Sequence, residues 1–494
     1  MAEAVSIEIQ QELNASREIE TENTESQKEA NISNENKSPY ERLVSALGKM
    51  IKRPEPSFSF ECRIKRIPDH LRKVNERAYT PMIISIGPLH HFDKKLQLMK
   101  MFKVRYLKSF IARANINLEN LVSTIREMEE RINCCYAEAS LGMDTDVFLK
   151  IILVDAIFIL ELIVRSVFGC SESDDLLIAD QMIPIIYDLV LLENQLPFFV
   201  LEKLFNLNPK LSNISSLIDL TFKFFEPFNV REIPPKNVKI EHFTDLIRIF
   251  QLPQPQNLPK RRTGSEIVTL MYSATQLHEA GVKFHVNSSK CLLDITFNFK
   301  NGVLEMPCLE LYDGTEALIR NVMAFEQYCF GEKIYIRDYY YFLDCLVNTT
   351  RDIDLLCDNG IIRNYLGDNK TATSLVNKLN IHVSLSGINP NHNRIFKELN
   401  AFYEKPWHKW RATLRYQYFS TPWRIASTVA AIILLVFTFI QTVCSIIQID
   451  LLFDCFSINL CKCSVCNVWL VRGLMKSLDC CRFLIFPDCH LLFI

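Results

Sequence analysis

The sequence predicts a mainly α-helical protein: one large helical domain with a small β-hairpin, followed by a single C-terminal transmembrane helix. Three observations lead to this prediction. Apolar residues recur every three or four positions in many segments, which is the period of an amphipathic helix. Asn301–Gly302 separates two short runs rich in β-branched and aromatic residues, a pattern typical of a β-hairpin. Residues 425–449 contain no charged side chain.

The composition bounds the class of protein. The 494 residues are 49% hydrophobic and carry a net charge of −2, so a large core can form and no general attraction to nucleic acid is expected. Nine of the 17 cysteines are scattered between Cys62 and Cys357, which is typical of a reducing compartment. The first residues lack a basic region followed by an apolar run, so we expect no cleavable secretory signal.

The chain divides into parts of different composition. Residues 1–40 carry nine glutamates against three basic residues and predict a disordered acidic tail. Residues 41–420 are predicted to form the helical domain, with a proline-rich loop or linker at 230–262. Helices are expected at 95–113, 117–138, 148–168, 180–192, 197–205, 265–282, 315–329, 338–356, 371–381 and 391–418.

The helix at 148–168 is apolar enough to suggest a membrane span, but Lys150, Asp155, Glu161 and Arg165 interrupt it. Each charge at mid-span would cost about 2.5 to 3.5 kcal/mol in lipid. We therefore expect a core helix, with Asp155 and Glu161 serving as a buried polar pair or as caps. Six residues along one helix place these two carboxyls about 120° apart, which argues against a single acid–base site.

The apolar stretch DLVLLENQLPFFVL (188–201) contains three consecutive polar residues just before a proline. Helix ends leave backbone groups without intrahelical partners, and polar side chains at a turn can supply those partners. A catalytic cluster is the alternative, but buried polar groups usually satisfy backbone. The predicted helix joint consists of Asp180, Gln181, Glu193, Asn194, Gln195 and Pro197, with Asp180 as a helix cap and Pro197 in the next first turn.

The segment 425–449 is predicted to cross a membrane. Gln441 and Gln448 are its only strongly polar side chains, and at ~1.5 Å per residue it spans a hydrocarbon core of ~30 Å. Trp423 and Arg424 stand at its entrance as membrane-interface anchors.

The flanking charges predict the orientation. Lys405, Lys409, Arg411, Arg415 and Arg424 precede the span, whereas Asp450 and Asp454 follow it. The positive-inside rule therefore favours a cytosolic N-terminal domain, and we expect a single-pass protein of the plasma membrane. The glycosylation sequons at Asn213, Asn287 and Asn348 would be usable only in the opposite orientation.

Several segments, in one order over about residues 60–445, carry a family resemblance. They are CRIKRIPDHLRKVNERAYTPMIISIGPLHH (62–91), ILVDAIFILEL (152–162), LENQLPFFVL (192–201), ATQLHEAGVKF (274–284), FEQY (325–328), DCLVNTTRDIDLLCDNGIIRNYLG (344–367) and YFSTPWRIAS (418–427). Together they resemble a plant family known as domain of unknown function 247. The resemblance implies a mostly helical domain with one C-terminal transmembrane helix and no established reaction. Some grass members resemble determinants of pollen–stigma self-recognition, which implies recognition rather than catalysis.

The chain departs from this family pattern after the span, where the cysteine-rich segment 450–494 continues. It is either a functional tail or a gene-model extension through an intron or an altered frame. A zinc site usually needs two closely spaced cysteine pairs, and only one such pair of zinc-site form occurs among Cys455, Cys461, Cys463 and Cys466. We therefore expect neither a metal nor another cofactor. Reversible lipidation of the juxtamembrane Cys444 or Cys455 is an alternative that is favoured over a metal site.

We interpret the remaining candidate histidines and basic residues as structural or solvent-exposed groups. The adjacent His90 and His91 are expected to have a loop or packing role, because neighbouring side chains point in different directions. We assign no ligand role to the lone histidines His70, His242 and His278. The basic run between Arg63 and Arg77 is interleaved with acidic residues; it predicts a solvated face, with anionic lipid headgroups as an alternative partner.

The sequence contains no G-x-S-x-G, P-loop, G-x-G-x-x-G or H-E-x-x-H motif. We therefore expect no enzyme activity, but a protein-recognition or scaffolding module with specificity in loops around 230–262 and 283–314. A membrane-bound enzyme with an unrecognised active site is the alternative. A pocket lined by convergent titratable groups would favour the enzyme, and a core in which those groups are paired would favour the recognition module.

Overall fold

Most of the described chain is helical, as the sequence predicts. The computed structural model describes Tyr40, Leu43, Val44 and Gly48, and residues 64–136, 143–169, 180–236, 238–253, 258–259, 268–331, 334–382, 387–407, 410 and 422–458. The chain divides into two compact units, Met1–Lys405 and Pro406–Ile494. The predicted acidic tail, apart from Tyr40, and residues 459–494 of the cysteine-rich segment lie outside the described residues.

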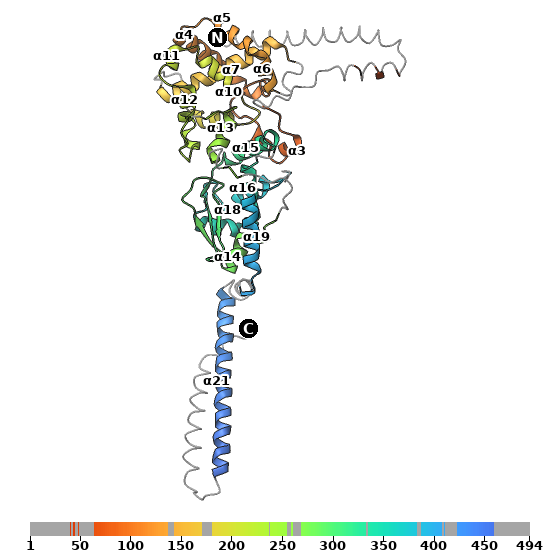
Figure 1. Cartoon of the computed structure of the whole chain (residues 1–494), viewed down its shortest axis with the longest axis vertical. Coiled ribbons are helices and arrows are strands. Elements are labelled where there is room, and N and C mark those ends of the chain that lie inside the picture. The colour runs from red at the N-terminus through yellow and green to blue at the C-terminus, as the bar shows by residue number, and fades with distance from the viewer. Residues whose placement is uncertain are drawn as a thin grey trace, which may run out of the picture. The chain divides into compact units, whose positions relative to one another are not determined.

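The N-terminal half of the first unit is built around α7 (Thr145–Phe168), as Figure 1 shows. Nearly every side chain of α7 from Phe148 to Arg165 is buried, which confirms a core helix at 148–168. Four helices pack directly against it: α4 (Lys100–Ala114), α5 (Leu118–Glu127), α10 (Phe198–Phe205) and α12 (Leu217–Phe224). The remaining elements are α3 (Asp69–Arg72), η1 (Glu76–Tyr79), η2 (Lys94–Met99), α6 (Glu129–Cys135), α9 (Met182–Leu189), α11 (Pro209–Ser212), η4 (Glu226–Phe228) and α13 (Phe243–Gln251).

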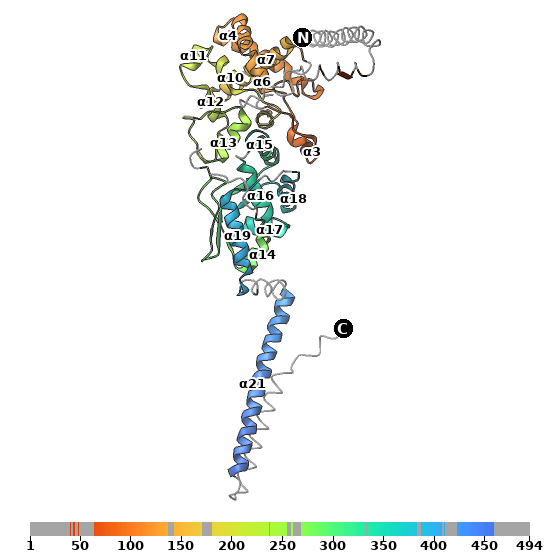
Figure 2. The same ribbon diagram turned by 45° about the vertical axis from the view of Figure 1, so that its right-hand side comes forward.

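The C-terminal half of this unit combines helices with two small sheets. Its helices are α14 (Ala274–Ala280), α15 (Thr315–Cys329), α16 (Ile336–Leu346), α17 (Thr350–Asp358), α18 (Asn369–Leu379) and α19 (Pro390–Glu404). Figure 2 shows α16 to α19 gathered with α14 in this half. The two halves meet where α15 packs against η1 and α13.

The predicted hairpin is present and belongs to a larger sheet. β2 (Thr296–Asn298) pairs antiparallel with β3 (Val303–Met306), and Gly302 enters β3 with φ +64°. β1 (Lys283–Val286) adds to β3 in parallel, which gives the order β1-β3-β2. A separate parallel pair joins β4 (Leu309–Leu311) to β5 (Ile362–Asn364).

The helix predicted at 265–282 is shorter in the structure, because α14 begins at Ala274. Backbone groups just before it have tertiary partners: the Val268 amide donates to Asn393 Oδ1 (2.8 Å) and the Met271 amide to Asn400 Oδ1 (3.1 Å). These side chains of α19 take the place of helical hydrogen bonds. The predicted stop is correct, since Gly281 caps α14 in the left-handed conformation.

Three further boundaries differ from the sequence prediction. The helix expected at 338–356 is divided into α16 and α17, because Thr349 and Asp352 form a capping box that starts a new helix. The helix expected at 391–418 ends at Glu404 as α19. The proline-rich range 230–262 is not loop throughout, since it contains α13, whose apolar face is buried.

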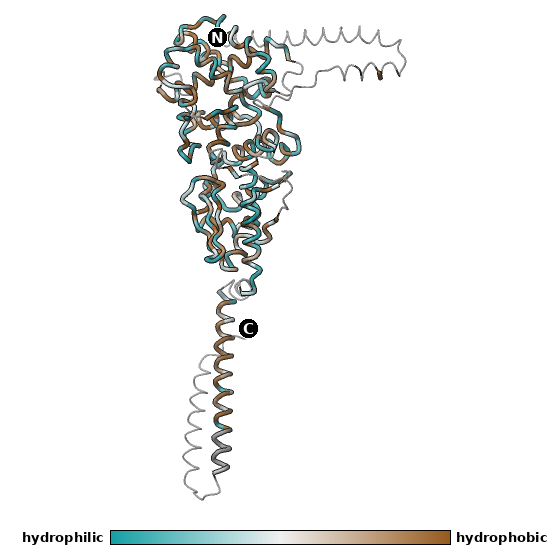
Figure 3. Tube along the Cα trace, in the orientation of Figure 1, coloured by the Kyte–Doolittle hydropathy of each residue, from teal (hydrophilic) through white to brown (hydrophobic). Residues whose placement is uncertain are grey.

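The second unit contains α21 (Pro422–Ile458). Its residues Pro422–Ile449 form the one helix in the described chain that is long and apolar enough to cross a membrane. Figure 3 shows this helix hydrophobic along most of its length, in contrast to the mixed first unit. The side chains from Trp423 to Leu435 are exposed or half-exposed, so this apolar surface has no cover within the described chain.

Gly302→Ala should destabilise the first unit by about 2 to 4 kcal/mol, because it adds overpacking to left-handed strain. An alanine Cβ at this position would lie 2.8 Å from Phe402 Cζ. Gly331→Ala is the matched control, since Gly331 has φ +55° and no atom within 4 Å of the added Cβ. Urea unfolding of both variants measures the difference; equal losses of stability would contradict the role of the Phe402 contact.

Candidate functional site

A cluster of buried polar groups lies at the joint between α9 and α10. All residues from Asp188 to Phe198 are buried, including Glu193, Asn194 and Gln195, which are each 1% exposed. Their partners come mainly from an irregular segment, residues 64–88, which has few backbone hydrogen bonds of its own outside short helical turns. Buried amides of such a segment need partners from elsewhere in the fold.

Asp188, at the end of α9, binds three consecutive amides of this segment. Met82 N donates to Oδ1 (2.8 Å), and Ile83 N (2.6 Å) and Ile84 N (2.9 Å) donate to Oδ2. Burial raises the pKa of Asp188 to about 6, although the three amides oppose that shift. The predicted helix joint did not include Asp188. The one sequence feature that could have indicated its role is its position as an acidic residue at the start of an otherwise apolar run.

Glu193 connects three different groups. Its Oε1 accepts from the Ile67 amide (2.5 Å) and from the Arg72 guanidinium, and its Oε2 lies 2.9 Å from His90 Nε2. Burial by itself raises the pKa of Glu193, but hydrogen bonds from His90, the Ile67 amide and Arg72 outweigh it and lower the pKa. The carboxylate is therefore held ionised by groups that lie more than one hundred positions away in the chain.

Asn194 uses both ends of its amide. Its Oδ1 accepts from the Ile86 amide (2.6 Å), and its Nδ2 donates to the carbonyls of Ile84 (3.0 Å) and Asp188 (2.9 Å). Asn194 thus continues, toward Ile86, the row of contacts that Asp188 begins at Met82.

Gln195 links two helix ends. Its Nε2 donates to the carbonyl of Leu189 (2.6 Å), the last residue of α9, and to that of Leu191 (2.7 Å) just beyond it. Its Oε1 accepts from the Phe243 amide (2.9 Å) at the start of α13. Its own carbonyl accepts from the Tyr136 hydroxyl (2.8 Å). These are backbone groups that helix ends leave unpaired.

Asp180 and Pro197 do not occupy the positions that the sequence predicted for them in the joint. α9 begins at Met182 with Gln181 as its N-cap residue and no side-chain cap bond, so Asp180, which is exposed, is not the expected cap. The helix ends at Leu189 rather than near Leu192, because Asn194 donates to the Asp188 carbonyl and Gln195 donates to the carbonyls of Leu189 and Leu191. Pro197 is the N-cap residue of α10, one position before its first turn.

The two carboxyls of α7 are not paired with each other, and both meet cations of α4. Asp155 pairs with Lys103 and also accepts from the Gly87 amide (2.8 Å). Glu161 accepts from Arg113 (2.5 Å) on α4 and from Arg165 Nε (2.9 Å) on its own helix. Burial raises the pKa of Asp155, and the neighbouring Lys103 opposes this.

The same use of buried carboxyls recurs in the C-terminal half. Glu326 accepts from Arg248 Nε (2.9 Å) and from the Ile336 amide (2.8 Å), which starts α16. Asp352 accepts from the Thr275 amide (2.8 Å) and so connects α17 to α14. Glu326 and Asp352 thus each bind a backbone amide of another part of the fold.

The other predicted residues fall into several groups. His90 has the Glu193 contact described above, His242 caps α13 by accepting from Asp245 N (3.3 Å), and His278 Nδ1 lies 3.3 Å from the Val282 carbonyl. Arg72 of the basic run points to Glu193, whereas Arg66 and Arg77 are exposed.

Near the membrane helix, Trp423 and Arg424 lie in the first turn of α21 and are exposed. Cys444 is exposed on α21. Cys455 also lies within α21, but its side chain falls outside the described residues, as do Cys461, Cys463 and Cys466. No group of three or more potential metal ligands occurs among the residues that the structure describes.

The fold and the joint define a mainly helical protein whose buried polar groups bind its own backbone and whose C-terminal helix could cross a membrane. This chain belongs to the DUF247 family, described as plant protein of unknown function, whose model matches residues 64–437. It is 29% identical to the UPF0481 protein At3g47200 of Arabidopsis thaliana, over 78% of this chain and 87% of that protein. It is 20% identical to the UPF0481 protein At3g02645 of the same plant, over 76% and 89% of the two chains. No solved structure matches significantly.

Glu193→Gln should lower the free energy of unfolding by about 1 to 3 kcal/mol at pH 7, because Arg72 and His90 lose a buried charged acceptor. Glu202→Gln on α10 is the control; Glu202 is exposed, and its loss of charge should change stability by less than about 0.5 kcal/mol. Urea unfolding of the full chain in detergent micelles measures both.

The same variant has a defined pH dependence. Because the pKa of Glu193 is lower in the folded than in the unfolded state, its stabilisation is complete above the unfolded value of about 4.5 and is lost as the pH falls through the folded value. The difference between wild type and Glu193→Gln should therefore shrink in acid. A difference that stays constant from pH 7 down to pH 3 would contradict a structural role of the ionised carboxylate.

Proposed function

We propose that this chain is a membrane-anchored protein that acts by binding another protein, as a recognition or scaffolding module, and not by catalysing a reaction. The observation that carries the proposal is the use of the buried carboxyls. Asp188, Glu193, Glu326 and Asp352 all bind amides of the protein's own backbone. A carboxyl committed in this way supports the fold and is a poor candidate for proton transfer to a substrate. We also propose α21 as the anchor.

Two loops in the ranges expected to carry specificity lie together and supply a candidate binding surface. Lys290 Nζ and Glu232 Oε1 are 3.0 Å apart, although both side chains are mostly exposed. Each loop is held in place: Arg231 donates to the Leu252 carbonyl, and Asn287 Nδ2 donates to the Asp294 carbonyl (2.9 Å). A surface built from ordered loops loses less conformational entropy on binding than a disordered one.

The orientation that we propose places the first unit in the cytosol at the plasma membrane. The support is the excess of basic residues before α21, where Lys405, Lys409, Arg411 and Arg415 precede Arg424.

Protease added to sealed plasma-membrane vesicles whose cytosolic side faces outward should digest an N-terminal tag and leave a C-terminal tag protected. The basic residues before the span are the physical reason, since they resist transfer across the membrane. Vesicles opened with detergent are the control, in which both tags should be digested. Protection of the N-terminal tag in sealed vesicles would reverse the orientation and make the sequons at Asn213 and Asn348, both exposed, relevant.

Exchanging residues 230–236 and 287–294 for the corresponding segments of the relative At3g47200 should change the set of proteins captured by proximity labelling. The reason is that the exposed side chains of Glu232 and Lys290, one from each loop, meet at the surface. Exchange of residues 207–216, a loop around α11 in the same half as α10, is the control and should leave the set unchanged. Identical sets for all three proteins would refute specificity in these loops.

A further inference from the structure

The outward side of η2 and α4 combines exposed apolar and basic side chains. Leu98, Met101 and Val104 are 65%, 52% and 47% exposed, which is unusual for large apolar residues on one helical face. Lys94, Lys95 and Lys108 are exposed beside them in the sequence. We call these six residues the α4 outer face.

The charge of this region has one sign. Seven basic residues and no acidic residue lie between Lys94 and Leu118. Lys103 and Arg113 turn inward to Asp155 and Glu161 of α7. In contrast, no ion pair within the described chain involves the three lysines of the outer face, which leaves a basic and apolar surface that suits an acidic and apolar partner.

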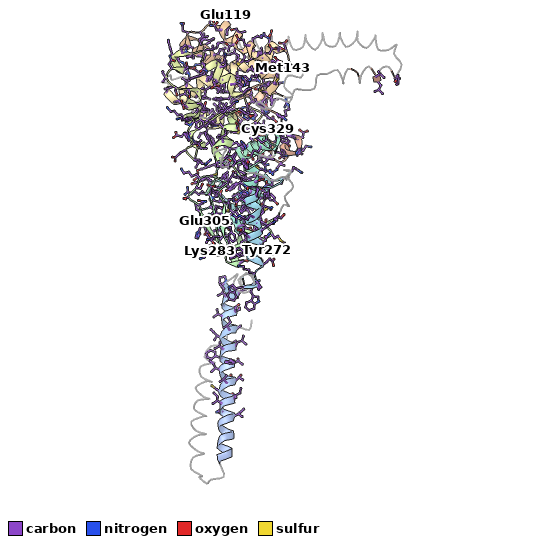
Figure 4. All side chains as sticks on the ribbon, viewed as in Figure 1. Glu119, Met143, Tyr272, Lys283, Glu305 and Cys329 are labelled. Carbon is purple, nitrogen blue, oxygen red and sulfur yellow. The ribbon has the colours of Figure 1, made fainter. Side chains whose placement is uncertain are left out.

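Within the first unit, the α4 outer face lies at the end opposite to the end at which the chain leaves the unit. α4 and α5 lie at one end of the first unit, and α14 and the end of α19 lie at the other (Figures 1 and 2). The labelled side chains Glu119 and Tyr272 mark these two ends in Figure 4. The first unit ends at Lys405, directly after α19 and therefore far from the outer face.

The N-terminal segment of the same chain has the complementary composition. Residues 1–40 contain nine glutamates and three basic residues. Within them Val5, Ile9 and Leu13 recur at every fourth position, with Glu8 and Glu12 directly before the latter two. In a helix, such spacing would place the three apolar side chains on one face with acidic groups beside it.

We propose that residues 1–20 bind the α4 outer face, with Val5, Ile9 and Leu13 against Leu98, Met101 and Val104, and with the glutamates near the lysines. This intramolecular contact covers the apolar side chains of the α4 outer face. Displacing it would uncover a basic and apolar face for an anionic partner.

The chain has the reach for this contact. Ile64, where the continuous described structure begins, forms a bridge with Tyr136 and belongs to the same core cluster as Met99 and Tyr106 of η2 and α4. About 50 residues separate Leu13 from Ile64 in the sequence, and the random-coil relation for that number of residues gives a root-mean-square span of about 40 Å. Tethering of this kind gives effective concentrations near the millimolar range, so a weak contact would be occupied.

The test places a photo-crosslinking amino acid at Met101 of the full chain in nanodiscs of phosphatidylcholine. The proposal expects crosslinks from this position to peptides of residues 1–20. The same amino acid at Met271, which is 72% exposed and lies just before α14, is the control and should give no such crosslink. Absence of N-terminal crosslinks at Met101, or equal yields at both positions, would overturn the proposal.

Charge variants make the test specific. Reversing Lys94, Lys95 and Lys108 to glutamate should lower the crosslink yield by about tenfold, since three exposed ion pairs are replaced by repulsion. Changing Glu3, Glu8 and Glu12 to lysine in the same chain should restore it. An unchanged yield after the first reversal would overturn the proposal, as would crosslinks to lipid in place of residues 1–20 when the nanodiscs contain phosphatidylserine, which would identify an anionic membrane as the partner.

Discussion

The first unit depends on one physical constraint: the buried amides of an irregular N-terminal segment must be satisfied without a neighbouring strand or a continuous helix. Side chains from the α9–α10 joint supply the partners, with Asp188 at Met82 to Ile84, Asn194 at Ile86 and Glu193 at Ile67. In this segment, side-chain oxygens accept the backbone hydrogen bonds that a helix or a neighbouring strand would otherwise accept. Its consequence is that a short turn decides where more than twenty residues of irregular chain can lie.

The joint also connects the two halves of the unit. Asn321 of α15 accepts from the Leu192 amide (2.8 Å) and donates to the Ala78 carbonyl (2.7 Å), so it contacts both the joint and η1. Gln195 reaches the start of α13 in the same way. Because buried polar groups with all partners present favour one arrangement, this network specifies how the helices dock, whereas the apolar core supplies most of the driving force.

Charged side chains are arranged differently in the interior and on the surface of the first unit. Inside, cations of α4 neutralise the acids of α7, and Arg248 neutralises Glu326, so charges that would be costly to bury are paired. Outside, the ordered loops around Glu232 and Lys290 and the apolar residues of the α4 outer face are available for contacts with other polypeptide segments. This organisation is the basis of the proposal that the chain binds another protein, with α21 as its proposed membrane anchor.

The sequence by itself determined the features that arise from local periodicity and local caps. α15 occupies the predicted residues 315–329, α14 stops at Gly281, and the apolar segment within α21 was evident from composition, because these depend on neighbours within a few positions. The unusual polar residues of the joint could be recognised, since Glu193 to Gln195 interrupt an apolar run. Only the tertiary structure decided their partners: Arg72 and Ile67 lie 121 and 126 positions from Glu193. It also decided that residues 268–273 are not helical, because Asn393 and Asn400 of α19 take their backbone groups, and no local pattern encodes a contact with so distant a side chain.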